Sequence, residues 1–209
     1  KVAASLDGKT ALDNGASQWI TSEEARQDGH AWRARATAVL TGIGTVLEDN
    51  PRLDVRHVAT PAQPFAVIVD SKLETPLDAA MFIEGRPLLV YGAVDDASRR
   101  ALLEARGATV IAKPGPSGKV DLAAMMRDLA AREVNELHVE AGHKLNGSLL
   151  REGLVDELVI YLAPKLLGHG RDLANLGPFT DLSQGVPLHL HSVDRVGPDI
   201  RVVARVVRP

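Results

Sequence analysis

The sequence contains no cysteine in its 209 residues. Disulfide scaffolds, iron–sulfur clusters and zinc sites with cysteine ligands are therefore excluded, and we expect a reducing, cytoplasmic location. Aromatic residues make up only 3% of the chain, too few for the stacking surfaces that bind single-stranded nucleic acid. The formal net charge of -3 also disfavours binding to a phosphate backbone, so we expect no nucleic-acid partner.

Long apolar runs are missing as well. The longest, around Leu88–Tyr91 and Val155–Ala163, are short or interrupted by charges and cannot span a bilayer. The first residues, Lys1–Ser5, lack a starting Met and the apolar region of a signal peptide, and they read as the inside of a strand. We therefore expect no membrane partner, and we expect Lys1 to be a cut point rather than a natural start.

What is present is a regular alternation of strand and helix patterns. Strands are predicted at Val2–Leu6, Ala38–Thr41, Ala66–Val69, Leu88–Tyr91, Thr109–Ala112, Leu137–Glu140 and Leu158–Leu162, with a closing hairpin at Leu188–Val193 and Ile200–Val207. Helices are predicted after a capping box at Thr21–Glu24, after Gly42–Thr45, at Asp96–Arg106, after the N-cap Asp121 and near Leu145–Arg151. This order predicts an α/β fold: a mixed, mainly parallel central sheet with helices on both faces and a C-terminal antiparallel hairpin.

Three strand exits carry residues suited to a ligand, since ligands of such sheets bind beyond the carboxyl ends of strands. Gly42–Thr45 and Glu140–Ser148 each lead through glycine into a helix N-terminus, which favours a phosphate. Asp70–Lys72 offers a hydroxyl and an ammonium group. Each has a purely structural alternative: a tight turn, a capped helix with solvated charges, and an Asx turn. Rossmann and P-loop motifs are absent from the sequence.

The histidines do not predict a metal site. His189 and His191 alternate along one strand face, but the sequence offers no third ligand at a sensible spacing. Two arginines, Arg33 and Arg56, are better candidates for function because a guanidinium group binds phosphate in a bidentate manner. Taken alone, an arginine more often solvates a surface.

Six segments, read together, closely resemble one family. They are Ala3–Lys9, Ser17–Ser22, Thr45–Leu53, Asp70–Leu73, Val139–Gly142 and Gly153–Leu158. From Lys1 to Val207 the chain resembles the reductase domain of the bifunctional riboflavin-biosynthesis deaminase–reductase. The resemblance implies one reductase domain over residues 1–209, without the deaminase domain, whose zinc site needs cysteine ligands that this chain lacks.

The resemblance also implies a dihydrofolate-reductase-like fold and an NADPH-dependent oxidoreductase. The family reduces 5-amino-6-(5-phosphoribosylamino)uracil to the ribitylamino compound: the ribose ring opens to an imine, and hydride passes from nicotinamide C4 to C1′. Because the cofactor supplies the reactive hydride, the protein needs neither a nucleophile nor a metal; it aligns the reactants and excludes water.

Residue roles follow from the same resemblance. Substrate contacts are expected at Ser17, Arg33, Leu53, Arg56 and Glu140, with Arg33 and Arg56 at the ribose phosphate and Glu140 at the polar ring or chain. NADPH contacts are expected at Ala3, Trp19, Thr45, Asp49, Ser71, Gly142, His143, Lys144, Leu145, Asn146, Gly147 and Ser148. Lys1, Asp49 and Glu140 are the expected catalytic residues: Lys1 polarises the sugar oxygen or imine, and Asp49 handles a proton. His143 departs from the small residue or proline expected in this turn.

Two alternatives stay open at this point. One is a dihydrofolate-reductase-like enzyme acting on another substrate, although the helix after Thr21 offers Arg33 rather than a pterin-binding carboxylate. The other is a non-catalytic nucleotide-binding module. We expect a small-molecule phosphoribosylaminouracil substrate and, since the family is commonly oligomeric, a homodimer or higher homo-oligomer.

Overall fold

The computed structural model describes residues 1–207 and divides the chain into two compact units. The central unit runs from His30 to Ala141, and the terminal unit combines Lys1–Gly29 with the chain from Gly142 onward. Helix α1 (Glu23–Arg35) contributes residues to both. No helix within residues 1–207 is long and apolar enough to cross a membrane.

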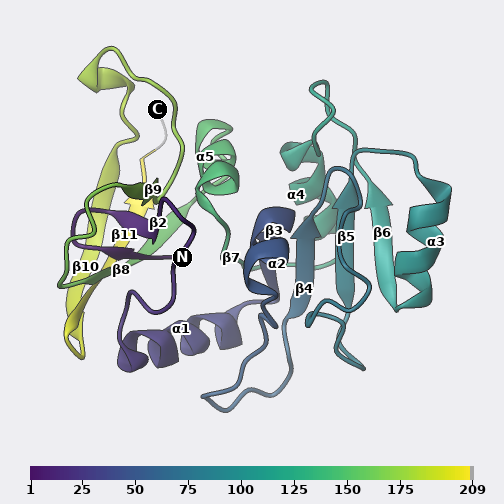
Figure 1. The fold of residues 1–209 in the computed structure, drawn as a ribbon, viewed down its shortest axis with the longest axis horizontal. Coiled ribbons are helices and arrows are strands. Elements are labelled where there is room, and N and C mark those ends of the chain that lie inside the picture. The colour runs from purple at the N-terminus through teal and green to yellow at the C-terminus, as the bar shows by residue number, and fades with distance from the viewer. Residues whose placement is uncertain (208–209) are drawn as a thin grey trace. The chain divides into compact units, whose positions relative to one another are not determined.

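The central unit is built on a five-stranded sheet. Its strands, in spatial order, are β6 (Ala108–Ala112), β5 (Leu88–Gly92), β4 (Phe65–Val69), β3 (Ala38–Gly42) and β7 (Leu137–Val139). All neighbours pair in parallel, as Figure 1 shows for β4, β5 and β6. Strands of a parallel sheet are covered on both faces, and the inner strands are accordingly mostly buried and rich in Val, Leu and Ile.

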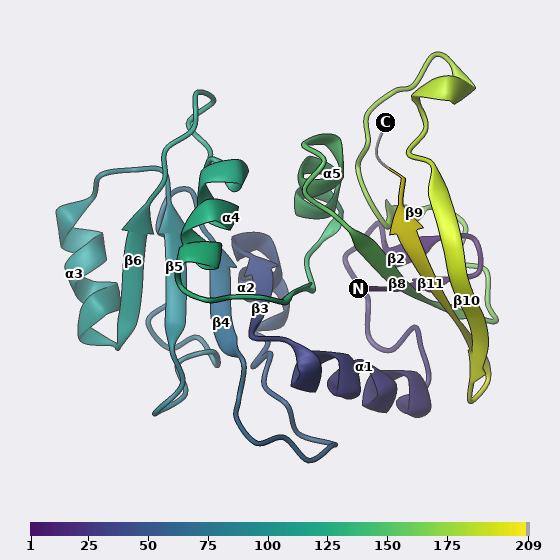
Figure 2. The ribbon, with the colours of Figure 1, turned by 180° about the vertical axis from the view of Figure 1, so that it is seen from behind.

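Helices cover both faces of this sheet. They are α2 (Ile43–Asp49), α3 (Ala97–Ala105) and α4 (Leu122–Ala131). The connections from β3 to β4 and from β6 to β7 run in opposite directions across the sheet. Because such crossovers are right-handed, α2 and α4 lie on opposite faces (Figures 1 and 2). The predicted N-cap of α4 forms, since Asp121 accepts a hydrogen bond from the Ala124 amide at 2.8 Å. Asp96, predicted as the first residue of a helix, is instead the N-cap of α3 and accepts from the Arg99 amide at 2.8 Å.

The terminal unit holds a four-stranded mixed sheet. Its order is β1 (Val2–Ser5), β8 (Glu157–Ala163), β11 (Asp199–Val206) and β10 (Leu188–Val196). Strands β1 and β8 are parallel, and β11 pairs antiparallel with β8 and with β10, giving the long hairpin seen in Figure 2. The unit also contains helix α5 (His143–Arg151), a 3-10 turn at Leu182–Gln184 and a small sheet of β2 (Lys9–Leu12) with β9 (Gly170–Asp172).

The predicted α/β class, the parallel sheet and the C-terminal hairpin are confirmed. Two details of the prediction are wrong. The small sheet of β2 and β9 was not predicted, because only Ala11 of β2 is buried and no alternating pattern results. The N-cap of α1 is Ser22 rather than Thr21: the Ser22 hydroxyl accepts from the Ala25 amide at 3.2 Å, while Thr21 is buried.

Candidate active site

Three of the predicted site segments lie at one edge of the central sheet. Strands β3, β4 and β7 are parallel, so Gly42, which ends β3, and Ser71 and Glu140, which follow β4 and β7, lie at the same carboxyl edge. Glu140 comes one residue after β7, and its amide still donates to the Leu40 carbonyl at 2.8 Å. Sheets of this kind bind ligands at this edge.

Glu140 forms an ion pair with Arg33 of α1. The Arg33 Nε donates to Glu140 Oε1, and Nη2 donates to Oε2 at 3.0 Å, in a bidentate pair whose side chains are 14% and 15% exposed. Burial acts to lower the pKa of Arg33, but the charge and hydrogen bonds of Glu140 outweigh it and leave that pKa raised. On the other side, His138 Nε2 lies 3.4 Å from Glu140 Oε1, and the Thr41 hydroxyl donates to the Glu140 carbonyl. Glu140 therefore has a fixed position and a cationic partner.

A second charged cluster lies on the segment after α2. The Asp54 carboxylate, 9% exposed, accepts from Arg52 Nε at 3.0 Å and from Arg56 Nη1. Burial acts to raise the pKa of Asp54, but the hydrogen bond from Arg52 and the charges of Arg56 and Arg52 leave it lowered. The two arginine side chains are 53% and 45% exposed. One ionised carboxylate thus holds two guanidinium groups, and the cluster keeps a net positive charge toward solvent.

The last turns of α1 contact this segment through two residues on one face. Arg33 Nη1 donates to the Asp54 carbonyl at 3.0 Å, and the Arg56 amide donates to His30 Nδ1 at 3.4 Å. His30 is buried and packs edge-on against the His57 ring at 4.6 Å. Burial, followed by the charges of Arg33 and Arg56, lowers the pKa of His30 to about 4. The imidazole is therefore neutral at pH 7 and accepts a backbone hydrogen bond.

The remaining predicted residues of the central unit lie on α2 and the strand exits. Thr45 is half-buried in α2, Asp49 is exposed at its end, and Leu53 is buried with a φ of 51°. The Ser71 hydroxyl accepts from the Val120 amide at 3.2 Å, which leaves its proton for another acceptor. The structure thus brings Arg33, Glu140 and Arg56 together through Asp54, and places the others on neighbouring segments.

In the terminal unit, Lys1 lies beside a buried tyrosine. Its ammonium group is 5.6 Å from the centre of the Tyr161 ring. The Tyr161 hydroxyl donates to Asp28 at 2.5 Å, and Arg201 Nη1 donates to the same carboxylate at 2.9 Å. Ala3 is the strand partner of Tyr161 across β1 and β8. The side chains around Lys1 therefore form one fixed network.

Ser17 and Trp19 lie on the segment between β2 and α1. Ser17 is half-buried, whereas the Trp19 side chain is 65% exposed and stacks on the Arg26 guanidinium at 4.6 Å from the ring centre. An exposed indole is available to a planar ligand.

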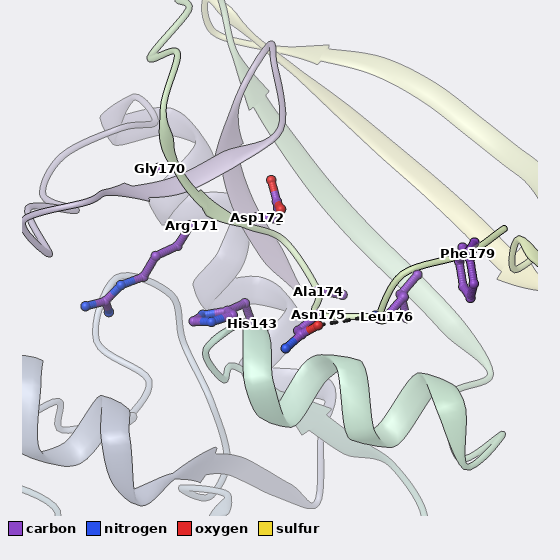
Figure 3. A pocket seen from close by; sticks show the side chains of 9 residues that line it. His143, Gly170, Arg171, Asp172, Ala174, Asn175, Leu176 and Phe179 are labelled. Carbon is purple, nitrogen blue, oxygen red and sulfur yellow. Dashed lines mark hydrogen bonds between the residues drawn. The ribbon is translucent and has the colours of Figure 1, made fainter.

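Seven of the twelve residues predicted to hold the cofactor, Gly142–Ser148, are the N-cap and the first six residues of α5. Gly142 is the N-cap residue, with φ of -73° and ψ of 167°, and no side-chain hydrogen bond caps the helix within residues 1–207. His143 borders a hollow of about 510 Å³ on the side of the segment after β9, where Figure 3 shows it below Arg171 and Asp172. Asn146 and Gly147 face that segment: the Asn146 amide donates to the Leu173 carbonyl at 3.0 Å, and Gly147 packs on the Asn175 backbone.

Comparison with known proteins decides the family. The family described as "RibD C-terminal domain" matches residues 1–202, nearly the whole chain. The chain belongs to this family. Within it, the chain is 36% identical over 201 residues to the riboflavin biosynthesis protein RibD of Aquifex aeolicus, covering 96% of this chain and 55% of that protein. It thus spans about half the length of such relatives.

Other members of the family cover the chain as completely. The 5-amino-6-(5-phosphoribosylamino)uracil reductase of Buchnera aphidicola (subsp. Acyrthosiphon pisum) is 29% identical over 201 residues, which are 92% of this chain and 97% of that protein. The structure of Acinetobacter baumannii RibD superposes with a TM-score of 0.84 at 34% identity, over 99% of this chain and 57% of that one. These relatives and the strand order support the dihydrofolate-reductase-like fold of the family.

Several residues of these networks were not anticipated from the sequence, among them the carboxylates Asp54 and Asp28 and the cation Arg201. Asp54 carried a usable signal, since it stands two residues from Arg52 and Arg56 on an extended segment. Asp28 and Arg201 carried none, because they meet across 173 residues of chain. Among residues 1–207, no group of three His, Cys, Asp or Glu side chains is arranged to hold a metal ion.

Proposed function

We propose that this chain catalyses the NADPH-dependent reduction of 5-amino-6-(5-phosphoribosylamino)uracil to 5-amino-6-(5-phosphoribitylamino)uracil. The observation that carries the proposal is the charged arrangement of the central unit, in which an exposed arginine pair and a fixed carboxylate occupy neighbouring segments. A phosphate and a polar pyrimidine need these two kinds of partner. Membership of the RibD C-terminal domain family supports the same reaction.

The substrate phosphate binds at Arg56, with Arg52 beside it. Their guanidinium groups are exposed, are held in place by Asp54, and retain donors for phosphate oxygens. Arg33 acts chiefly on Glu140, because its Nε, Nη1 and Nη2 already donate to Glu140 and Asp54. Glu140 then accepts from the polar ring or chain, and Ser17 and Leu53 complete the substrate contacts.

Each segment assigned to NADPH carries a group suited to one part of a dinucleotide. A helix N-terminus such as that of α5 favours a phosphate, Ser71 keeps a hydroxyl proton to donate, and the exposed Trp19 offers a flat surface. Thr45, Asp49 and Ala3 are the further contacts that the family resemblance assigns. When bound, the nicotinamide supplies the hydride that reduces C1′ of the opened ribose.

Two residues handle protons and polarity in this proposal. The Lys1 ammonium, held against Tyr161, polarises the sugar oxygen or the imine nitrogen. Asp49, exposed at the end of α2, handles the proton that accompanies ring opening and reduction.

A homodimer or larger homo-oligomer is part of the same proposal. Strand β10 is the outer strand of its sheet, and Leu188, Leu190 and Val193 on it are 41%, 59% and 58% exposed. An edge strand of nine residues with exposed apolar side chains favours pairing with another copy. A cytoplasmic location also belongs to the proposal and rests on the family resemblance.

The test is NADPH oxidation followed at its absorbance with three additions in parallel: the phosphoribosylaminouracil, dihydrofolate and buffer. The proposal predicts oxidation with the first alone, and slower or absent oxidation when NADH replaces NADPH. Oxidation with dihydrofolate would indicate a different substrate, and oxidation with neither would point to a nucleotide-binding module.

A further inference from the structure

Arg86 is a buried arginine whose three guanidinium nitrogens each donate a hydrogen bond to the backbone of the same loop. It precedes β5 and is 7% exposed. Nε donates to the Pro64 carbonyl at 2.8 Å, Nη1 to the Arg52 carbonyl at 2.6 Å, and Nη2 to the Leu53 carbonyl at 2.8 Å. All three acceptors belong to residues 51–64, the substrate loop, which lies between α2 and β4.

The substrate loop needs such support because of its conformation. Leu53 has a φ of 51°, a region that non-glycine residues rarely adopt. Arg86 holds the backbone of the substrate loop near both of its ends, at Arg52 and Leu53 and at Pro64. Within the loop, the Gln63 side chain accepts from the Val55 amide at 2.7 Å and donates to the Val55 carbonyl at 2.9 Å. A single guanidinium therefore fixes the turn that presents Arg52, Leu53 and Arg56.

We propose that Arg86 is a positioning residue for the substrate: its planar guanidinium sets the backbone of Arg52 and Leu53, and through it the place of the phosphate-binding side chains. The inference rests on the function proposed above. It assigns Arg86 no contact with substrate or cofactor, and it predicts an effect confined to the substrate. Lysine cannot replace it, because one ammonium group cannot reach three carbonyls in the same plane.

The central variant is Arg86→Lys, which keeps the charge and removes the planar fork. Arg106→Lys is the matched control. Arg106 Nε also donates to a backbone carbonyl, that of Leu77 at 2.8 Å, on a segment with no assigned site residue. KM and kcat are measured for both reactants with each variant. If Arg86→Lys does not fold, Arg86→Gln, a smaller neutral amide donor, takes its place.

We expect Arg86→Lys to raise KM for the phosphoribosylaminouracil by about tenfold, as the loss of charge-assisted hydrogen bonds implies, with KM for NADPH within about twofold of wild type. Arg106→Lys should change neither KM. A purely structural role would lower the folded fraction, and with it kcat, while leaving both KM values unchanged. That result, or an equal rise in both KM values, would overturn the inference.

A second measurement keeps this inference separable from the proposed reaction. In wild-type protein the amides of Val55 and Arg56 are bonded to Gln63 and His30. Arg86→Lys should speed hydrogen exchange at these two amides by about tenfold or more relative to amides of β4. Unchanged exchange would refute the positioning role even if the enzyme acted on another substrate. Failure of wild-type reduction with faster exchange in the variant would refute only the proposed function.

Discussion

Protonation of His30 should couple the stability of the central unit to pH. His30 Nδ1 accepts the Arg56 amide, and the ring is enclosed near the cationic Arg33 and the ring of His57. Charging the imidazole would remove the acceptor and place a cation beside two guanidinium groups. For this reason burial and these charges lower the pKa of His30 from 6.5 to about 4.

The sign and size of the effect follow from proton linkage. Between the two pKa values the unfolded chain binds a proton at His30 and the folded chain does not, so the free energy of unfolding falls as the pH falls. The loss begins near the unfolded pKa of 6.5, and is complete below the folded pKa of about 4. Integration gives about 2 kcal/mol lost between about pH 7.5 and about pH 5, and roughly 3 kcal/mol in total.

Urea unfolding of wild type and of His30→Gln at these two pH values measures this directly. The variant lacks the titrating group, so its loss of stability on acidification should be smaller than that of wild type by about 2 kcal/mol. His189→Gln, at an exposed position of β10, serves as the control and should follow wild type. Parallel pH profiles for wild type and His30→Gln would show that His30 is not held neutral in the folded state.

Three further predictions concern the proposed site and its frame. Arg56→Ala should raise KM for the phosphoribosylaminouracil by about tenfold to a hundredfold while NADPH binding, measured by fluorescence titration, stays intact; loss of NADPH binding alone would reassign the phosphate sites. Asp49→Asn should reduce kcat by about a hundredfold with unchanged NADPH affinity, and unchanged turnover would remove Asp49 from the mechanism. Gly147→Ala should destabilise the terminal unit by about 1–3 kcal/mol in thermal unfolding, because the added Cβ meets the Asn175 backbone. The control is Gly44→Ala, where the added Cβ meets open space. Equal destabilisation by both substitutions would contradict the packing argument.

Asp54 illustrates how the charge balance of the site depends on burial. If the carboxylate were fully exposed, its ion pairs with the two arginines would contribute little to the stability of the fold. Here the carboxylate is nearly enclosed while both guanidinium groups reach solvent, so the carboxylate orients the arginines without neutralising them. This arrangement leaves a locally positive cluster, as the proposed phosphate site requires, in a chain whose net charge is -3.

Local information in the sequence was sufficient for most elements. Strands such as Leu88–Gly92 and caps such as Asp121 depend on neighbouring residues, and apolar runs and N-cap hydrogen bonds can be recognised from spacing. The strand exits at Gly42, Ser71 and Glu140 were predictable for the same reason. Their meeting at one sheet edge follows from parallel pairing, which the alternation of strands and helices predicts.

Long-range contacts decided the rest. The start of α1 shifts by one residue to Ser22, whose amide donates to the buried Asp199 at 2.7 Å across 177 residues. Arg33 and Glu140, each predicted as a substrate contact, turn out to be partners of each other across 107 residues.

The sequence by itself determined the fold class, the strand ends that carry candidate ligand-binding residues, and the residue types available for chemistry. All of these can be recognised in short segments of the chain. The tertiary structure decided which charges neutralise one another, which remain exposed and which buried arginine holds the substrate loop. Those outcomes depend on distances between segments far apart in the chain, and no periodicity encodes such distances.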